Sequence, residues 1–196
     1  MGTGIVDALK KEFPLADTWA SFEIHPETPP GGVAIAELFP GRDMSAAGES
    51  LRRRAAEFGL PFVPSDWLSN SRAAIEAAEF ARDAGLFEPF HRGILEAYFA
   101  RGQDIGDPAV LSSVGVEVGL DQAALQVALA EQRYADRREA VAAEARRLGF
   151  SGVPTFVFAG RYPVVGAHAL DVFRDLLSRL RSAPTVSGAE MGHPQR

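Results

Sequence analysis

Residues Gly152, Val153, Pro154 and Thr155 have the clearest capacity for chemistry in this sequence, and that chemistry is recognition of a peptide backbone. Proline cannot donate a hydrogen bond to a β-ladder, so it opens a strand or lies at an edge. The Val153–Pro154 bond has only a small preference for trans, and a cis bond would turn the N–H and C=O of Val153 outward. These two groups could then pair with an extended peptide. The alternative is a trans proline that opens an ordinary edge strand.

Histidine exchanges its proton nearest to neutral pH, so His25, between Ile24 and Pro26, is a candidate proton shuttle. The alternative for this residue is an exposed loop histidine without a function. His91 and His168 are far apart in the sequence, and neither belongs to a His-x-x-x-His pattern. The sequence therefore predicts no metal site.

Asn70, Ser71 and Arg72 lie at the start of a stretch with apolar residues at helical spacing. The side-chain oxygen of Asn or Ser accepts a hydrogen bond from the first turn of a helix, which explains these residues as a cap without any function. The sequence predicts a helix over 72–84 that ends at Gly85.

The absence of cysteine limits the chemistry most strongly. A thiolate is the species that attacks a disulfide, so the chain as written cannot do so. The formal net charge of −6 argues against binding of nucleic acid through a basic surface. No basic start precedes an apolar core and no apolar run reaches about 18 residues, so the sequence predicts no signal peptide, no membrane span and, by default, a cytoplasmic location.

Two regions have the pattern of strands. Thr155–Phe158 is rich in β-branched and aromatic residues, Ala159-Gly160 is a turn, and Tyr162–Val165 returns, which predicts a β-hairpin. Polar and apolar residues alternate over Thr18–Ile24, which predicts a further strand.

The remainder of the sequence is predicted to be helical, apart from loops and a tail. Helical periodicity and caps predict helices over 46–58, 72–84 and 87–100, helices after Asp107 and Asp121, a long helix over 131–148 and a last one over 169–181. Residues 183–196 contain proline and glycine and little hydrophobicity, so we expect a disordered tail.

Gly152–Phe158, followed by a turn and Val164–Ala167, resembles the last third of DsbA-family thioredoxin-fold proteins. Phe22–Pro26, Asn70–Ala73 and Gly119–Asp121 also resemble that family, most of all its FrnE-like group of dithiol–disulfide isomerases, relatives of 2-hydroxychromene-2-carboxylate isomerase. The resemblance covers residues 4–182. It implies an α/β fold with a thioredoxin-like (DsbA-like) sheet and a large α-helical insertion. Residues 1–32 and 150–182 would form the thioredoxin-like portion, and 33–149 the insertion.

The chain also departs from that family. Members begin with a strand followed by Cys-x-x-Cys at the start of the first helix, whereas residues 1–9 look like the continuation of that helix. We therefore expect the first strand and the catalytic motif to be missing through a downstream start or truncation, and no catalytic residue can be assigned with certainty. The resemblance implies substrate-binding roles for the loop Gly152–Thr155 and for His25, Asn70 and Arg72, which correspond to residues around the cleft of relatives.

Two functional hypotheses follow from this comparison. The chain is either a DsbA-family thiol–disulfide oxidoreductase homologue that is redox-inactive as written, or a non-catalytic module that binds an extended peptide or a small thiol. No cofactor is predicted, and glutathione is the one candidate small ligand. Without the first strand, Thr18–Ile24 and the hairpin would face each other with unpaired edges, so we expect a homodimer through those edges, a marginal monomer or a rearranged sheet.

Overall fold

The computed structural model describes residues 1–182, in which helices predominate. The helices are α1 (Gly2–Lys10), α2 (Ile35–Leu38), α3 (Ser45–Ala56), α4 (Arg72–Asp83), α5 (Phe87–Phe99), α6 (Pro108–Glu117), α7 (Gln122–Ala130), α8 (Ala135–Arg147) and α9 (Leu170–Ser182). The strands are β1 (Val33–Ala34), β2 (Trp67–Leu68), β3 (Thr155–Phe158) and β4 (Tyr162–Val165). This arrangement agrees with the predicted α/β class with a large helical block. The tail predicted over 183–196 lies outside the described residues.

The predicted hairpin is confirmed. β3 and β4 pair antiparallel, with Thr155 opposite Val165 at one end and Phe158 opposite Tyr162 at the other. Ala159 has a φ of 50° and Gly160 a φ of 69°, the positive values of a type I′ turn. The Arg161 N–H closes this turn by donating to the C=O of Phe158 at 3.1 Å.

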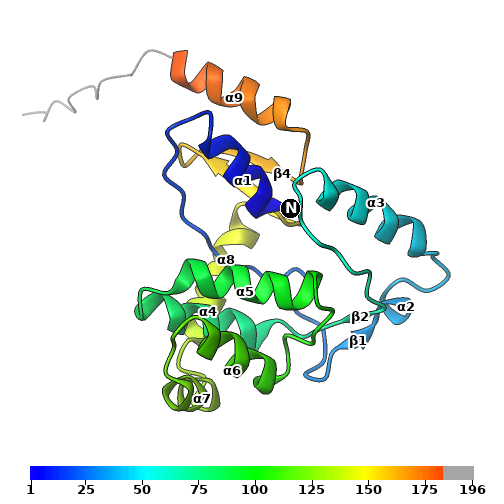
Figure 1. Cartoon of the computed structure of the whole chain (residues 1–196), viewed down its shortest axis with the longest axis vertical. Coiled ribbons are helices and arrows are strands. Elements are labelled where there is room, and N and C mark those ends of the chain that lie inside the picture. Colours follow the sequence, from blue (N-terminus) through cyan, green and yellow to red (C-terminus); the bar gives the residue numbers. More distant parts are fainter. Residues whose placement is uncertain (183–196) are drawn as a thin grey trace, which may run out of the picture.

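The hairpin packs against α1 and α9, which lie together at one end of the molecule (Figure 1). Ile5 and Leu9 of α1 meet Phe173 and Leu177 of α9 in a buried core, because residues four apart share one face of a helix. Partly buried residues complete this core, namely Phe13, Leu15, Phe58, Phe156, Phe158, Val164, Ala167 and Leu170. Phe58 follows α3, so the region predicted as the helical insertion also contributes to the core beneath the hairpin.

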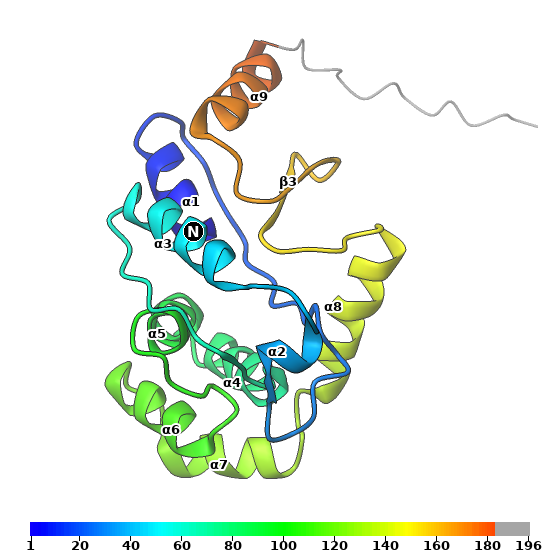
Figure 2. The same ribbon diagram turned by 90° about the vertical axis from the view of Figure 1, so that its right-hand side faces the viewer.

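A second core holds α4, α5, α6 and α7 together at the other end of the molecule, with α8 alongside (Figure 2). Its buried residues are Ala74, Ala77, Ala78, Ala81, Phe90, Ile94, Ala97, Leu111, Val114, Leu120 and Leu125. Two predicted caps are present: the Asp107 carboxylate accepts from the Ala109 N–H at 2.8 Å, and that of Asp121 from the Ala124 N–H at 2.9 Å.

The predicted strand over Thr18–Ile24 is wrong. The segment is irregular and pairs with no strand among residues 1–182. Its side chains and one carbonyl hold it to the helices instead: Arg82 of α4 donates to the C=O of Trp19 at 2.8 Å. An alternating pattern favours a strand only where a neighbouring strand supplies hydrogen bonds. Of the two facing strand edges that we predicted, only that of the hairpin is therefore present.

One further prediction needs correction. The helix expected over 131–148 begins only at Ala135, because Gln132 adopts a φ of 50° in the turn that separates α7 from α8. Within 33–149, Val33 and Ala34 pair with Leu68 and Trp67 in a short two-stranded sheet. No helix within residues 1–182 combines the length and apolar character that crossing a bilayer requires.

Candidate functional site

The loop Gly152–Thr155 leads directly into β3. Its Val153–Pro154 peptide bond is cis. The hydroxyl of Thr155 donates to the C=O of Gly152 at 2.7 Å, and the Gly166 N–H donates to the C=O of Pro154 at 2.7 Å. These bonds fix the loop on both sides of Val153. Val153 itself is 53% exposed, and no residue in the described range hydrogen-bonds to its backbone N–H or C=O.

The first turn of α1 lies against this loop. A Cβ built on Gly2 would be 3.1 Å from the Cβ of Pro154 and 3.8 Å from the ring of Trp19. Glycine at this position therefore allows the helix to approach the proline closely. The arrangement places the start of α1 beside the free backbone groups of Val153.

Helix α3 forms the opposite wall. The guanidinium of Arg54 donates to the C=O of Ala167 at 2.8 Å and also to that of His168, and it pairs with Glu57 at 2.7 Å. These contacts join α3 to the segment that follows β4, 113 residues away in the sequence. A groove of about 500 Å³ opens between the walls. It is lined by Met1, Ser50, Leu51, Arg53, Arg54, Glu57, Val153, Pro154 and Ala167.

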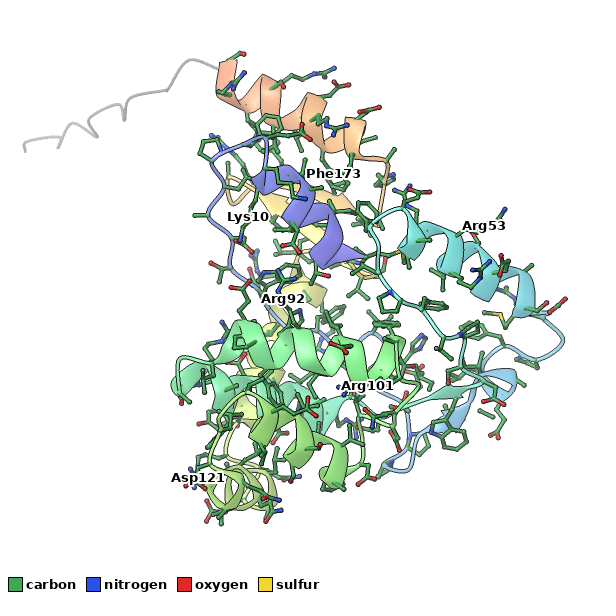
Figure 3. All side chains as sticks on the ribbon, viewed as in Figure 1. Lys10, Arg53, Arg92, Arg101, Asp121 and Phe173 are labelled. Atoms are coloured by element: carbon green, nitrogen blue, oxygen red, sulfur yellow. The ribbon has the colours of Figure 1, made fainter. Side chains whose placement is uncertain are left out.

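Arg53 gives this groove a positive wall. It lies on α3 (Figure 3), its side chain is exposed, and no carboxylate of the described residues pairs with it. Its two neighbours differ, because Arg52 pairs with Glu49 at 2.7 Å and Arg54 with Glu57. An uncompensated guanidinium beside free peptide groups suits a ligand that carries both a peptide backbone and a carboxylate.

His25, Asn70 and Arg72, predicted from the resemblance as binding residues, form a separate group around the turn 25–28. The Asn70 amide donates to the C=O of Thr28 at 2.7 Å, and its oxygen accepts from the Arg72 N–H at the start of α4 at 3.0 Å, whereas Ser71, the N-cap residue, makes no side-chain cap bond. The guanidinium of Arg72 donates to the C=O of Pro26. The His25 ring pairs with Glu27 at 2.9 Å. None of the three lines the groove beside Val153.

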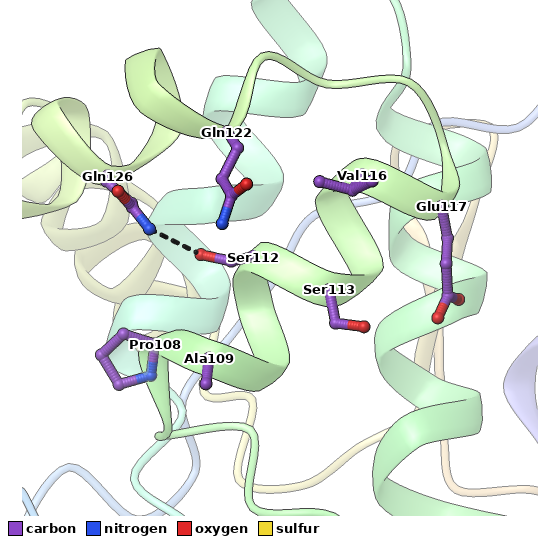
Figure 4. A pocket seen from close by; sticks show the side chains of 8 residues that line it. All are labelled: Pro108, Ala109, Ser112, Ser113, Val116, Glu117, Gln122 and Gln126. Atoms are coloured by element: carbon purple, nitrogen blue, oxygen red, sulfur yellow. Dashed lines mark hydrogen bonds between the residues drawn. The ribbon is translucent and has the colours of Figure 1, made fainter.

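A second groove, of about 540 Å³, lies between α6 and α7 (Figure 4). It is lined by Pro108, Ala109, Ser112, Ser113, Val116, Glu117, Gln122 and Gln126. Its one internal hydrogen bond among these side chains runs from the amide of Gln126 to the hydroxyl of Ser112 at 3.3 Å. The groove is at the opposite end of the molecule from the proline loop (Figure 1) and holds no pair of titratable groups.

The sequence indicated the proline loop but not the wall that faces it. Arg52, Arg53 and Arg54 are consecutive, and the pattern alone suggested a solvated helix face. Because successive helical residues point about 100° apart, three adjacent arginines cannot share one environment. That spacing could have shown that one of the three faces the fold, although not which carbonyl groups it reaches.

Comparison with known proteins agrees with this arrangement. The family model described as the DSBA-like thioredoxin domain matches residues 7–178. The chain is 27% identical over 168 residues to the uncharacterized protein YwbO of Bacillus subtilis, covering 82% of this chain and 80% of the relative.

Two solved structures share the fold. The structure is similar to that of a probable DsbA oxidoreductase from Streptomyces coelicolor, with a TM-score of 0.86 and 23% identity over 97% of this chain and 88% of the other. It is also similar to a 2-hydroxychromene-2-carboxylate isomerase, with a TM-score of 0.69 and 18% identity over 91% and 87% of the two chains. The family match extends from within α1 to within α9 and so includes the proline loop, helix α3 and the helical block, whereas the first turn of α1 precedes it. The chain belongs to the family of DSBA-like thioredoxin domains.

Proposed function

We propose that this chain is a redox-inactive DsbA-like protein that binds an extended peptide, or a small thiol peptide such as glutathione, in the groove beside Val153. The observation that carries this proposal is the exposed Val153, whose backbone N–H and C=O have no partner among residues 1–182. An unpaired donor and acceptor on one residue can form two hydrogen bonds with the C=O and N–H of one residue of an extended peptide. Within the family, the FrnE-like group is the branch that we propose for this chain.

The absence of cysteine supports a binding role over thiol–disulfide exchange. Exchange requires a thiolate that attacks a disulfide sulfur, and the sequence contains no sulfur other than that of its three methionines. In an insulin-reduction assay with dithiothreitol, we expect the purified chain to leave the reduction rate at that of the buffer. A rate above the buffer would refute redox inactivity.

Because Arg53 lines the groove, we further propose that the ligand carries a carboxylate near the residue that pairs with Val153. Substitution Arg53→Glu reverses the charge on the wall of the groove, and at an exposed site we expect about fivefold weaker binding of an acidic peptide. The matched control is Arg52→Glu, since Arg52 is the preceding residue of α3 but does not line the groove and already pairs with Glu49. Equal effects of the two substitutions would contradict the assignment of Arg53.

Thermal-shift measurements with glutathione and with short acetylated peptides test the binding proposal directly. A ligand that binds only the folded state raises the melting temperature in a concentration-dependent manner. We expect a shift with peptides, and a shift with glutathione if one peptide unit and a carboxylate suffice. The absence of a shift with every ligand would remove the proposal. The cytoplasmic location stays a prediction, which fractionation of cells that express the tagged protein would check.

A further inference from the structure

Helix α3 is attached to the rest of the fold mainly at its C-terminal end (Figure 1). Ala55 is the one buried residue of the helix, at 3% exposed, and Phe58, just beyond the helix, packs into the core beneath the hairpin. Near Gly48 the helix passes close to Pro64. Among residues 1–182, no hydrogen bond or ion pair joins positions 45–53 to a position outside 43–57. The last turn of α3 therefore largely determines where its earlier turns lie.

Arg54 supplies the polar part of this attachment. Its Nη2 atom donates to the C=O of Ala167 at 2.8 Å and also to that of His168. Its Nη1 atom donates to the carboxylate of Glu57 at 2.7 Å, and its guanidinium carbon is 5.8 Å from the ring centroid of Phe58. Hydrogen bonds from a charged donor are shorter and stronger than those between neutral groups. One side chain thus joins the last turn of α3 to the segment that follows β4.

Arg53 and Arg54 are neighbours on this turn but have different surroundings. Arg53 lines the groove, its side chain is exposed, and no carboxylate of the described residues pairs with it. Arg54 also lines the groove, but its guanidinium is already engaged by two carbonyl groups and by Glu57. Of the two, Arg53 is therefore the cation that is available to a ligand. Because successive residues of a helix hold a fixed relation to each other, a shift of Arg54 would also move Arg53.

We propose that Arg54 is a positioning residue: it holds α3 on the carbonyl groups that follow β4, and so places Arg53 to pair with the carboxylate of a bound ligand. This inference rests on the proposed function, because it requires a ligand in the groove. It goes further by dividing carboxylate recognition between two adjacent arginines. Arg53 contacts the ligand, whereas Arg54 acts through Arg53. Without Arg54, the apolar contacts of Ala55 and Phe58 still hold the last turn, but such contacts are non-directional.

Isothermal titration calorimetry of the full chain with two forms of one peptide tests this division of roles. The probes are acetyl-Ala-Val-Ala with a free C-terminal carboxylate and the same peptide as its C-terminal amide. The ratio of their dissociation constants measures recognition of the carboxylate, and we expect wild type to bind the acid about fivefold more tightly. In Arg54→Met this preference should be lost, although Arg53 is still present. A merely structural role would weaken the binding of both forms alike, so an unchanged ratio would overturn the inference.

Further variants separate position from charge, and they keep the test decisive if Arg54→Met does not fold. Arg54→Lys keeps the positive charge but loses the planar fork that reaches two carbonyl groups, so it should also lower the preference for the acid. A full wild-type preference in Arg54→Lys would show that charge alone matters, which would overturn the positioning role.

A double variant shows whether Arg54 acts through Arg53. In Arg53→Gln/Arg54→Met, the preference for the acid should equal that of Arg53→Gln alone, because the two residues form one coupled unit. A lower preference in the double variant would mean that Arg54 contacts the ligand itself. The matched control is Arg52→Gln, since Arg52 pairs with Glu49 and does not line the groove. An equal loss of preference in this control would contradict the assignment.

Hydrogen exchange of the unliganded protein tests the positioning role without a ligand. Loss of the contacts of Arg54 should speed exchange of the backbone amides of α3 at least about fivefold and leave those of α4 unchanged. Unchanged exchange of α3 in Arg54→Met or Arg54→Lys would overturn the inference whatever the ligands show. Equal affinities of wild type for the two peptide forms would overturn the inference and leave the proposed function intact. Binding of neither form, nor of glutathione, would overturn both.

Discussion

The imidazole of His91 stacks on the phenyl ring of Phe87, with the ring centroids 5.4 Å apart and the ring planes inclined by 11°. The ring centroid of Trp19 is 5.2 Å from that of His91. The Nε2 atom of His91 is buried without a hydrogen-bond partner among the described residues. This burial, assisted by the positive charges of Arg92 and Arg82, lowers the pKa of His91 from 6.5 to about 4. The folded state therefore favours neutral histidine at this position.

His91 is expected to make stability dependent on pH. The pKa of His91 is lower in the folded state than its unfolded value of 6.5. Its contribution to the free energy of unfolding is therefore complete above pH 6.5 and is lost as the pH falls towards 4. This residue alone should make the free energy of unfolding of the wild type about 2 kcal/mol lower at pH 5 than at neutral pH. His91→Phe should remove that dependence, as measured by urea unfolding at pH 7 and pH 5. Exposed His168→Gln is the control, and an unchanged pH dependence in His91→Phe would contradict the assignment.

Arg138 holds two buried carboxylates in place. Its Nε is 3.2 Å from Glu76 and its Nη1 is 3.9 Å from Glu23; both carboxylate side chains are only 7% exposed, and that of Arg138 is 15% exposed. Removal of the cation leaves the buried carboxylate of Glu76 without an ion-pair partner, so Arg138→Met should destabilise the protein by about 3–5 kcal/mol. Arg137→Met is the matched control, because Arg137 is half exposed and pairs with Asp83, and it should destabilise the protein far less. Chemical denaturation measures both, and a similar cost for the two variants would show that the Arg138 site is effectively solvated.

Prediction from the sequence succeeded where the cause of a structure lies within a few residues. The helix caps at Asp107 and Asp121 and the turn at Ala159-Gly160 depend on local hydrogen bonds and backbone angles, and each was predicted in the right place. The unpaired backbone of Val153 could likewise be suggested from the sequence, because that suggestion rested on Pro154, the next residue.

Prediction failed where a structure depends on a distant partner. Thr18–Ile24 has the alternation of a strand, but no strand lies beside it, and Glu23 within it is held instead by arginines of α4 and α8. The contact of Arg54 with the Ala167 carbonyl spans 113 residues and has no pattern in the sequence. The wall that faces the proline loop could therefore be found only from the coordinates.

Gly4 permits the close packing of α1 against Phe58. A Cβ at position 4 would lie 2.8 Å from the Cβ of Phe58 and 3.2 Å from a methyl carbon of Leu60, and the Phe58 Cβ cannot move without its backbone. Gly4→Ala should therefore destabilise the protein by about 1–3 kcal/mol, despite the higher helix propensity of alanine. In Gly48→Ala, within α3, the nearest atom would be the Cβ of Pro64 at an ordinary 3.5 Å, and we expect a gain of up to about 1 kcal/mol. Thermal and urea unfolding compare the pair, and a stabilised Gly4→Ala variant would refute the tight contact.

Ala159 adopts a backbone conformation that its side chain disfavours. Its φ of 50° lies in the left-handed region, which costs a residue with a Cβ roughly 1–2 kcal/mol, whereas asparagine tolerates it better. Asn-Gly is also the preferred pair for the type I′ turn that Ala159 and Gly160 form. Ala159→Asn should therefore stabilise the protein by about 1 kcal/mol and raise the melting temperature by a few degrees. Ala159→Val should have the opposite effect, because a β-branched residue is the least suited to positive φ. If calorimetry gave both variants the same melting temperature as wild type, the positive φ of Ala159 would be contradicted, and the turn would have to be of another type in solution.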